Sequence, residues 1–279
     1  MGRIVAAAAT SHILMAPVGV EERAKRIVAG MNEIGRHLRA ARPDAIIVIS
    51  SDHMFNINLA LQPPFCVGVS DGYVPFGDMD IPREKRPGNR ALGETLVRRA
   101  AAGGFDLAKA EELRPDHGVA LPLLAVDPER CIPIVPLLVN INMDPPPAPA
   151  RCHALGRVLR LTVEEDRPAG ERVAVLATGG LSHWLNVPRH GEVDEAFDRW
   201  VMDILIAGRG QELARLSAAD IVTRGGNGGL EVMNWLMAGA AAGETGGEVV
   251  YYEKMPEWFT GMGGIMLDVD GEIKEAVNA

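Results

Sequence analysis

Residues 46–53 read Ile-Ile-Val-Ile-Ser-Ser-Asp-His. Four consecutive β-branched apolar residues are typical of a strand that is buried on both faces, as in the middle of a parallel sheet. The apolar run ends at two serines and an aspartate, so we expect His53 just beyond the carboxyl end of this strand. Open α/β sheets bind ligands in the crevice outside those carboxyl ends. The stretch therefore predicts both a central strand and a histidine at a binding site.

A second histidine occupies the same kind of position near the start of the chain. His12 follows the apolar run of residues 4–9 and is preceded by Ser11. Residues 4–9 and 45–51 are predicted strands, and the charged amphipathic segment 20–41, which ends before Pro43, is the predicted helix between them. This βαβ opening would place both strands in one sheet. We therefore expect His12 and His53 to meet at one point in space.

The remaining chain alternates between short apolar runs and amphipathic segments. Further strands are predicted at residues 65–69, 132–140, 172–177, 249–252 and 265–269, and further helices at 89–102, 151–165, 194–207, 211–216 and 230–242. This alternation predicts the α/β class. Pro133 and Pro136 favour an edge or irregular position for strand 132–140. Residues 72–87 are rich in Gly, Pro and Asp and predict a surface loop that could border a pocket.

The domain organisation follows from length and from one proline-rich stretch. Residues 145–149 are too few for a clear domain boundary, and we interpret them as a rigid loop. A chain of 279 residues can form one large α/β domain. We therefore expect a single domain over residues 1–279, with no internal repeat and no disordered tail of note.

Composition excludes several classes of partner. The chain carries 28 Lys and Arg against 37 Asp and Glu, a formal net charge of −9, and it has no basic run of the kind that binds nucleic acid or anionic lipid. No stretch approaches the roughly 20 apolar residues of a membrane span. Cys66, Cys131 and Cys152 are odd in number and widely spaced, which fits a reducing compartment and argues against disulfides and a Cys-rich zinc site. We expect a cytoplasmic protein that binds neither nucleic acid nor membrane.

Four of the seven histidines share a local context. His37 and His153 fall in charged amphipathic helices, where surface positions are expected, and His190 lies in an uninformative loop. The other four each sit at a strand end or in a tight polar loop: His12, His53, His117 and His183. A lone histidine in such a place is more often structural, but four of them favour a common site.

Glu231 is the matching carboxylate. It lies in the first turn of segment 230–242, which is apolar nearly all round and is therefore predicted to be a buried helix. A buried carboxylate is costly unless a cation or metal compensates it, although the helix dipole favours an anion in the first turn. The alternative is a first-turn glutamate that reaches solvent. Together with the histidines, the ligand interpretation is favoured.

Two imidazoles and one carboxylate form the facial triad that leaves coordination positions open on non-haem Fe(II). A closed structural zinc site would use four protein ligands, usually including thiolates. The sequence contains no H-E-x-x-H pair, no G-x-G-x-x-G after a strand and no G-x-x-x-x-G-K, so zinc proteases and nucleotide-binding proteins lack support. The segment 178–183, Thr-Gly-Gly-Leu-Ser-His, lacks the second glycine of a serine-hydrolase elbow.

With these motifs assembled, the chain resembles the class III extradiol ring-cleaving dioxygenases of the protocatechuate 4,5-dioxygenase β-subunit type. The resemblance runs from end to end and is carried by Ser11-His12, by residues 51–53, 62–69, 116–123 and 178–183, by Glu231 and by residues 256–261. The Asp-His-Gly and Gly-Gly-Leu-Ser-His segments are specific only together with the N-terminal Ser-His. Segments 62–69 and 256–261 are similar to those of the catechol-propionate enzymes of this family, but the chain is shorter between His190 and Glu231.

The resemblance implies an α/β sandwich with a central mixed β-sheet flanked by helices, assembled as a homo-oligomer or with a small partner subunit. It implies that His12, His53 and Glu231 hold Fe(II) and that His117 and His183 carry out acid–base chemistry. We assign His183 as the base and His117 as the acid, with exchange of the two roles left open. The substrates would be O2 and a small dihydroxy-aromatic compound, broadly a substituted catechol.

Two competing interpretations remain at this stage. The same ligands could hold zinc in a hydrolase or oxidase, because histidine and carboxylate sites bind zinc well. The fold could also persist as a metal-free binding module. The sequence identifies neither the ring that is cleaved nor its substituent; Arg189 is an expected substrate contact, although a surface charge is as plausible.

Overall fold

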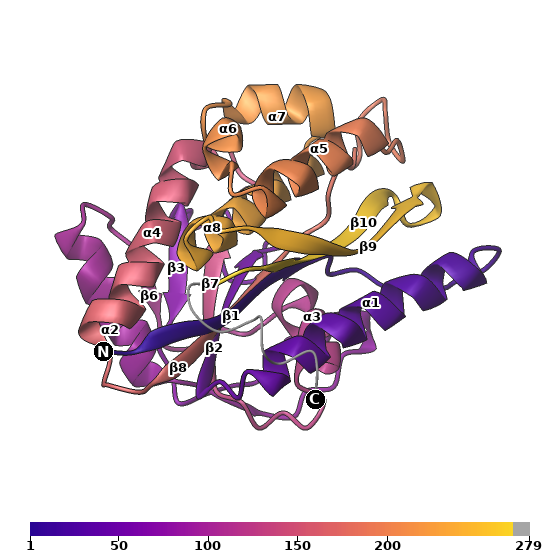
Figure 1. The fold of residues 1–279 in the computed structure, drawn as a ribbon. Helices are drawn as coiled ribbons and strands as arrows, with labels where there is room; N and C mark the ends of the chain where they lie inside the picture. Colours follow the sequence, from indigo (N-terminus) through magenta and orange to yellow (C-terminus); the bar gives the residue numbers. More distant parts are fainter. Residues whose placement is uncertain (270–279) are drawn as a thin grey trace.

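The computed structural model describes residues 1–269, and its centre is an eight-stranded sheet in the order β6-β3-β7-β2-β8-β1-β10-β9 (Figure 1). The strands are β1 Arg3–Thr10, β2 Ala45–Ser51, β3 Phe65–Gly68, β6 Ala108–Ala110, β7 Ile134–Val139, β8 Arg172–Thr178, β9 Gly247–Met255 and β10 Thr260–Leu267. The inner strands β7, β2, β8 and β1 run parallel to one another. β3 against β7, and β10 against both β1 and β9, are antiparallel. The sheet is therefore mixed, as the resemblance implied.

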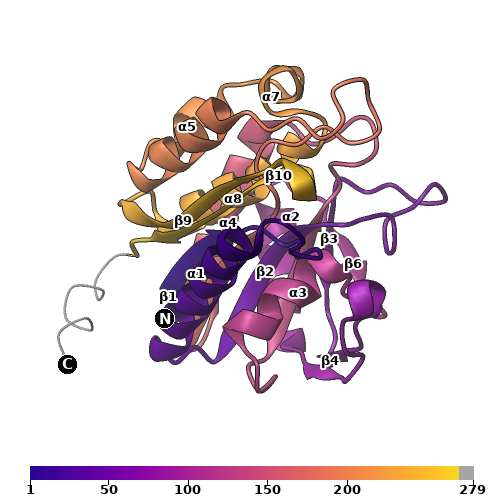
Figure 2. The same ribbon diagram turned by 90° about the vertical axis from the view of Figure 1, so that its right-hand side faces the viewer.

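Helices cover both faces of this sheet (Figures 1 and 2). One face is covered by α1 Glu21–Ala40 and α3 His117–Val126. The other is covered by α2 Arg90–Ala102, α4 Pro149–Asp166, α5 Glu195–Ile206 and α8 Val232–Ala242, with α6 Gly210–Ala214 and α7 Ala218–Gly225 further out. The prediction of an α/β sandwich is confirmed.

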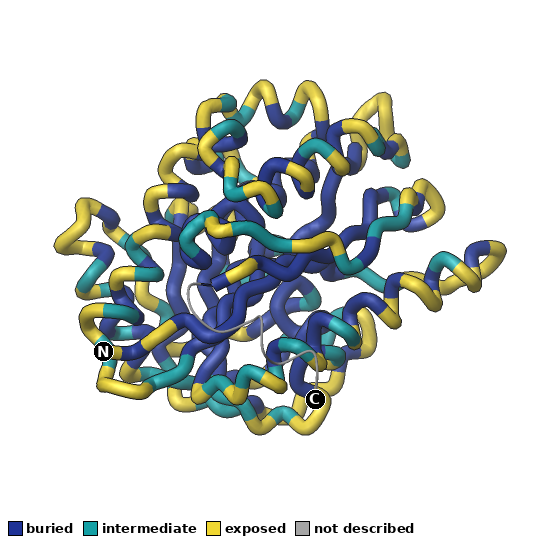
Figure 3. Tube along the Cα trace, viewed as in Figure 1, coloured by how far each residue is buried: buried dark blue, intermediate teal, exposed yellow. Residues whose placement is uncertain are grey.

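The stretch that opened the sequence analysis explains why two helical layers are needed. Residues 45–51 are all buried in β2, and the central strands are dark throughout in Figure 3. Ile46 and Val48 belong to the core on the α1 and α3 side, whereas Ile47 and Ile49 belong to the core beneath α4 and α8. Side chains alternate between the two faces of a strand. A run of apolar residues without alternation therefore requires cover on both faces.

Strand β7 corrects one prediction. Despite Pro133 and Pro136, it lies inside the sheet between β3 and β2 rather than at an edge. The physical reason is the limited pairing on one side: β3 pairs only with Leu137–Val139, while Pro136 lies opposite Val48 of β2. A proline without an N–H is tolerated where the strand has a ladder partner on one side only.

The structure also differs from the sequence-based predictions at two helices and one histidine. Neither α3 nor α7 was predicted, and His153 is buried at 5% exposure instead of lying on the surface. The charged partner of His153 is Glu244, whose carboxylate lies 3.0 Å from Nε2. No helix within residues 1–269 is long and apolar enough to cross a membrane. The predicted absence of a disordered tail concerns residues 270–279, which lie outside the described residues.

Removing part of the Ile47 side chain tests the buried role of β2. Ile47 is fully buried, and Ile47→Ala should lower the free energy of unfolding by about 2–5 kcal/mol because it leaves a cavity in a packed core. Urea denaturation measures the change. Val28→Ala, at a position 41% exposed on α1, is the control and should cost far less. Equal losses for the two variants would contradict burial of β2 on both faces.

Candidate metal centre

Five side chains from separate parts of the chain meet at the carboxyl edge of the parallel strands. His12 follows β1, His53 follows β2, and His117 begins α3. Single ligand atoms of these three imidazoles lie within 4.8 Å of one another. Glu231, at the end of the short helix η2 Gly228–Glu231, places Oε1 3.4 Å from Nε2 of His12 and 3.6 Å from Nε2 of His53. Nε2 of His183 lies 3.9 Å from Oε2, the other carboxylate oxygen of Glu231.

His12 is held as a neutral imidazole. Its residue exposure is 5%, and burial lowers its pKa to about 3 despite the nearby Glu231 charge. Its Nδ1 atom is buried and has no hydrogen-bond partner within the described part of the chain. Nε2, the ring nitrogen that faces Glu231, is the atom available to a metal at the site. A neutral imidazole is also the form that binds a metal.

His53 is oriented by Asp116, the residue that precedes a different histidine. One carboxylate oxygen of Asp116 accepts the backbone N–H of His53 at 2.9 Å and lies 2.9 Å from Nδ1. The other oxygen accepts the backbone N–H of Gly118 and caps α3. Burial lowers the pKa of His53, but its contacts with Asp116 and Glu231 outweigh burial and raise the pKa to about 10. Nε2 of His53 is thus aimed at Glu231.

Glu231 is a buried anion, with only 2% of the residue exposed. The backbone N–H of Gly180 donates to Oε2 at 2.5 Å. Burial alone would raise the pKa of Glu231, but its interactions with the facing imidazoles, which include a hydrogen bond from His53, lower it below its usual range. An ionised carboxylate in such a place requires a compensating positive charge. Two nearby imidazole nitrogens complete a donor set that suits a divalent cation.

His117 is positioned by Asp78, from the loop between β3 and α2. Oδ2 of Asp78 lies 2.6 Å from Nδ1 of His117 and accepts its backbone N–H at 3.1 Å. Asp78 begins the short helix η1 Asp78–Asp80, which lies between the two-residue strands β4 Gly72–Tyr73 and β5 Arg86–Pro87. The loop predicted at residues 72–87 therefore reaches the site. Because the Asp78 carboxylate accepts a hydrogen bond from Nδ1–H, Nε2 is the ring nitrogen left for the site.

His183 is fixed through its backbone and one ring nitrogen. Nδ1 lies 2.8 Å from the carbonyl oxygen of Leu181, and a carbonyl can only accept, so Nδ1 carries the proton. The backbone N–H donates to Gly225, and the carbonyl accepts from Gly228. A Cβ at Gly228 would lie 1.8 Å from Nε2 of His183, so any side chain at this position would displace the imidazole ring. The glycine cluster of residues 225–229 therefore packs directly against His183.

Arg189 and Asp52 make contacts outside the proposed metal site. Arg189 is exposed: its guanidinium pairs with Glu192 at 2.7 Å and stacks 4.0 Å from the ring of Trp184. Asp52 is buried, but its carboxylate accepts from Asn56 and Ile57 and so stabilises its own loop. The sequence analysis did not identify Asp78 as a partner of a site histidine. Its only signal was membership of the loop expected to border a pocket.

Comparison with known proteins identifies the class. Residues 6–263 match the family model described as the catalytic LigB subunit of aromatic ring-opening dioxygenase. This match covers well over half of the chain, so the chain belongs to that family. The family consists of metal-dependent dioxygenases, which agrees with the imidazole and carboxylate donors gathered at the sheet edge.

Individual relatives agree with this assignment. The 2,3-dihydroxyphenylpropionate/2,3-dihydroxicinnamic acid 1,2-dioxygenase of Photorhabdus laumondii is 26% identical, over 91% of this chain and 94% of its own. The enzyme of the same name from Rhodococcus jostii is 27% identical over 79% and 84%. Gallate dioxygenase of Pseudomonas putida is 34% identical, over 56% of this chain and 47% of its own length.

One solved structure shares the fold. An uncharacterized protein from Escherichia coli K12 superimposes with a TM-score of 0.64 at 20% identity, covering 94% of this chain and 99% of its own. At this identity the similarity concerns the fold alone.

A second buried carboxylic side chain stabilises the segment that carries His183. Asp198 of α5 is fully buried; it accepts the backbone N–H of Ser182 at 2.6 Å and the hydroxyl of Tyr252 at 2.9 Å. Burial raises the pKa of Asp198 to about 7. Because this pKa exceeds the unfolded value, the stability that protonated Asp198 contributes is complete below about pH 4 and is lost as the pH rises to about 7.

Asp198→Asn should remove this loss, because an amide can accept from Ser182 and donate to Tyr252 without ionising. The free energy of unfolding of the variant, relative to the wild type, should therefore rise between pH 4.5 and pH 8 in urea titrations. Asp203→Asn, an exposed position on the same helix, is the control and should show no such trend. If the free energy of unfolding of Asp198→Asn differed from that of the wild type by the same amount at every pH, the raised pKa of Asp198 would be contradicted.

Proposed function

We propose that this protein is an Fe(II)-dependent extradiol dioxygenase that opens the ring of a substituted catechol and incorporates both atoms of O2. The observation that carries the proposal is the buried Glu231 carboxylate, 3.4 and 3.6 Å from the imidazole nitrogens of His12 and His53 at the ends of β1 and β2. The family assignment supports the ring-opening reaction. The names of the relatives support a dihydroxy-aromatic substrate.

His12, His53 and Glu231 are the proposed metal ligands. The imidazoles of His12, His53 and His117 form an alternative set. We favour Glu231 over His117 because a buried anion left outside the coordination sphere would lack compensation. When bound, ferrous iron would supply Lewis acidity towards the adjacent ring oxygens and the redox capacity that reaction with O2 requires. Zinc on the same ligands stays the alternative that metal analysis decides.

His183 is the proposed general base. Its Nδ1 proton is committed to the Leu181 carbonyl, so the lone pair of Nε2 is available to take a proton from a substrate hydroxyl. His117 is the proposed acid: Asp78 holds its Nδ1–H, and in the imidazolium form its Nε2–H would deliver a proton to a leaving oxygen. A positioned acid or base contributes about 10²–10⁴-fold to the rate.

The domain organisation, the assembly and the compartment complete the proposal. We propose one catalytic domain over residues 1–279, in a homo-oligomer or with a small partner subunit. The cytoplasm is the proposed compartment, because Cys66, Cys131 and Cys152 are all free thiols. As a substrate contact Arg189 stays a prediction, and an anionic substituent would have to compete there with Glu192.

Alanine substitutions separate the ligands from the base. His12→Ala, His53→Ala and Glu231→Ala should each abolish both iron retention and turnover. His183→Ala should retain iron and lose about 10²–10⁴-fold in kcat. The measurements are iron content after anaerobic loading and O2 uptake with a panel of catechols.

His117→Ala and His37→Ala complete this series. His117→Ala should also retain iron. Loss of iron from this variant would favour the site formed by His12, His53 and His117. His37 pairs with Glu33 on α1 and serves as the control, with iron content and rate equal to the wild type. Release of iron from His183→Ala would contradict the assignment of His183 as a base.

Asp78→Asn tests the positioning of His117. Removal of the carboxylate should lower kcat by about 10–100-fold with iron content and KM nearly unchanged, since such supporting contacts orient the catalytic ring. Steady-state kinetics on iron-loaded protein provides the measurement. Asp80→Asn, an exposed neighbour on the same short helix, is the matched control. Equal kcat values for Asp78→Asn and the control would show that Asp78 does not position His117.

A further inference from the structure

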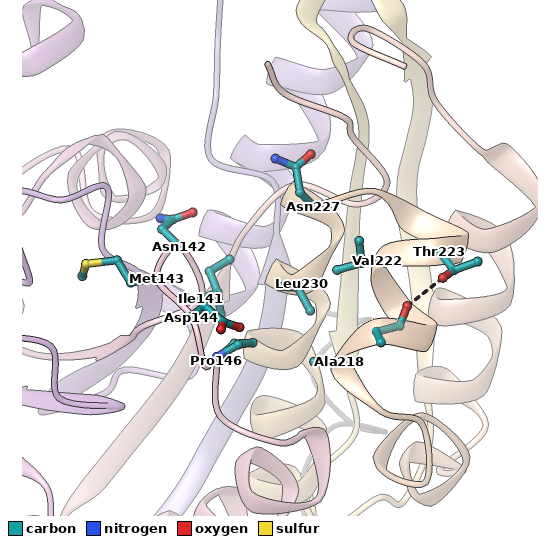
Figure 4. A pocket seen from close by; sticks show the side chains of 11 residues that line it. Ile141, Asn142, Met143, Asp144, Pro146, Ala218, Val222, Thr223, Asn227 and Leu230 are labelled. Carbon is teal, nitrogen blue, oxygen red and sulfur yellow. Dashed lines mark hydrogen bonds between the residues drawn. The ribbon is translucent and has the colours of Figure 1, made fainter. Parts of the chain in front are cut away.

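A groove of about 520 Å³ opens beside the proposed metal centre. One wall is the segment after β7, with Ile141, Asn142 and Met143, and the other is helix α7, with Ala218 and Val222 (Figure 4). The figure shows these two walls facing each other across the opening.

Three covalent or hydrogen-bonded links tie the groove to the site. Leu230, which lines it, is the chain neighbour of Glu231. Asn142 donates from Nδ2 to the carbonyl oxygen of Asp52 at 2.7 Å, and Asp52 is the neighbour of His53. Asn227 lies next to Gly228, which packs against His183. The groove therefore adjoins the segments that carry Glu231, His53 and His183.

The charge of the groove lining is unlike that of an anion-binding site. Among the described residues that line it there is no lysine or arginine, and the charged member is Asp144. The guanidinium of Arg224, on α7, is turned away and stacks 4.0 Å from the ring of Trp200. The first turn of α7 carries Asp220, so negative charge borders this wall as well.

The polar groups of the groove are largely engaged with the backbone. Oδ1 of Asn227 accepts the backbone N–H of Leu185, and Nδ2 donates to the carbonyl of the same residue. Thr223 donates its hydroxyl proton to the carbonyl of Ala219. The surface offered to a ligand is therefore mainly that of Ile141, Met143 and Val222 side chains.

From these observations we propose that the groove receives the ring substituent of the substrate and that this substituent is uncharged. The inference rests on the proposed function and adds a substrate class to it. It sets this chain apart from the relatives whose names specify the carboxylated substrates dihydroxyphenylpropionate and gallate. A carboxylate entering the groove would lose hydration without gaining a cationic partner.

A pair of compounds equal in shape isolates the charge: 3-(2,3-dihydroxyphenyl)propionic acid and its amide. The iron-loaded wild type should use the amide with a kcat/KM about tenfold higher, equivalent to about 1.4 kcal/mol. Anaerobic calorimetry should give the same preference in Kd, independently of turnover. Equal values for acid and amide in both measurements would overturn the inference.

Two variants connect the preference to the groove. Ala218→Phe should fill it and raise KM for the amide about tenfold while leaving unsubstituted catechol unchanged. Thr223→Lys should shift the acid-to-amide ratio of kcat/KM towards the acid by about three- to tenfold, and high salt should reduce this shift. Ala101→Phe and Ala101→Lys, at an exposed position on α2, are the matched controls and should change neither quantity. Unaltered substrate ratios in Ala218→Phe and Thr223→Lys would overturn the inference.

The outcome for the proposed function is separate. If the iron-loaded wild type opens neither catechol nor either test compound, the proposed function fails. The anaerobic Kd values then still decide the groove: an amide preference that Ala218→Phe removes supports it, and equal affinities for acid and amide overturn it. If Arg189→Ala, rather than the groove variants, alters the acid-to-amide ratio, the substituent lies at Arg189 and the inference is wrong.

Discussion

The constraint on which the rest of this structure depends is the burial of one carboxylate. Glu231 is ionised at 2% exposure, a state that costs several kcal/mol unless a positive charge lies against it. The backbone N–H of Gly180 and the imidazoles at the ends of two strands offset part of that cost. The proposed metal cation would complete the charge balance. The site is thus a region of the core in which the absence of a cation would be destabilising.

The sheet and the loops make different contributions to this region. His12 and His53 follow the central strands β1 and β2, which are paired on both sides within the sheet. Their separation is therefore set by the most rigid part of the fold. His117 and His183 lie in segments held by side chains and loops, through Asp78 and the glycine cluster. Two of the three groups proposed to bind metal, His12 and His53, are thus fixed by the sheet, while those proposed to move protons lie in the segments around it.

The sequence predicted this arrangement where a single physical rule dominated. The apolar run before His53 implied a strand covered on both faces, and Glu231 in an apolar helix implied a compensated charge. Prediction failed where several contacts had to be known together. Pro136 lies in an inner strand because its neighbour pairs only further along, and His153 is buried because Glu244 reaches it. Asp78 meets His117 from 39 residues away, a pairing that no local pattern encodes.

The segment that carries Asp78 has a consequence for how this protein fails under stress. Gly77, Met79 and Asp80 all have positive φ angles, and such conformations in non-glycine residues store strain that surrounding contacts must hold. Segments of this kind open locally at a lower free energy than the core does. Opening here would release the His117 ring while the sheet and the metal ligands stay in place. Warming should therefore inactivate the protein reversibly at temperatures where its secondary structure is still intact.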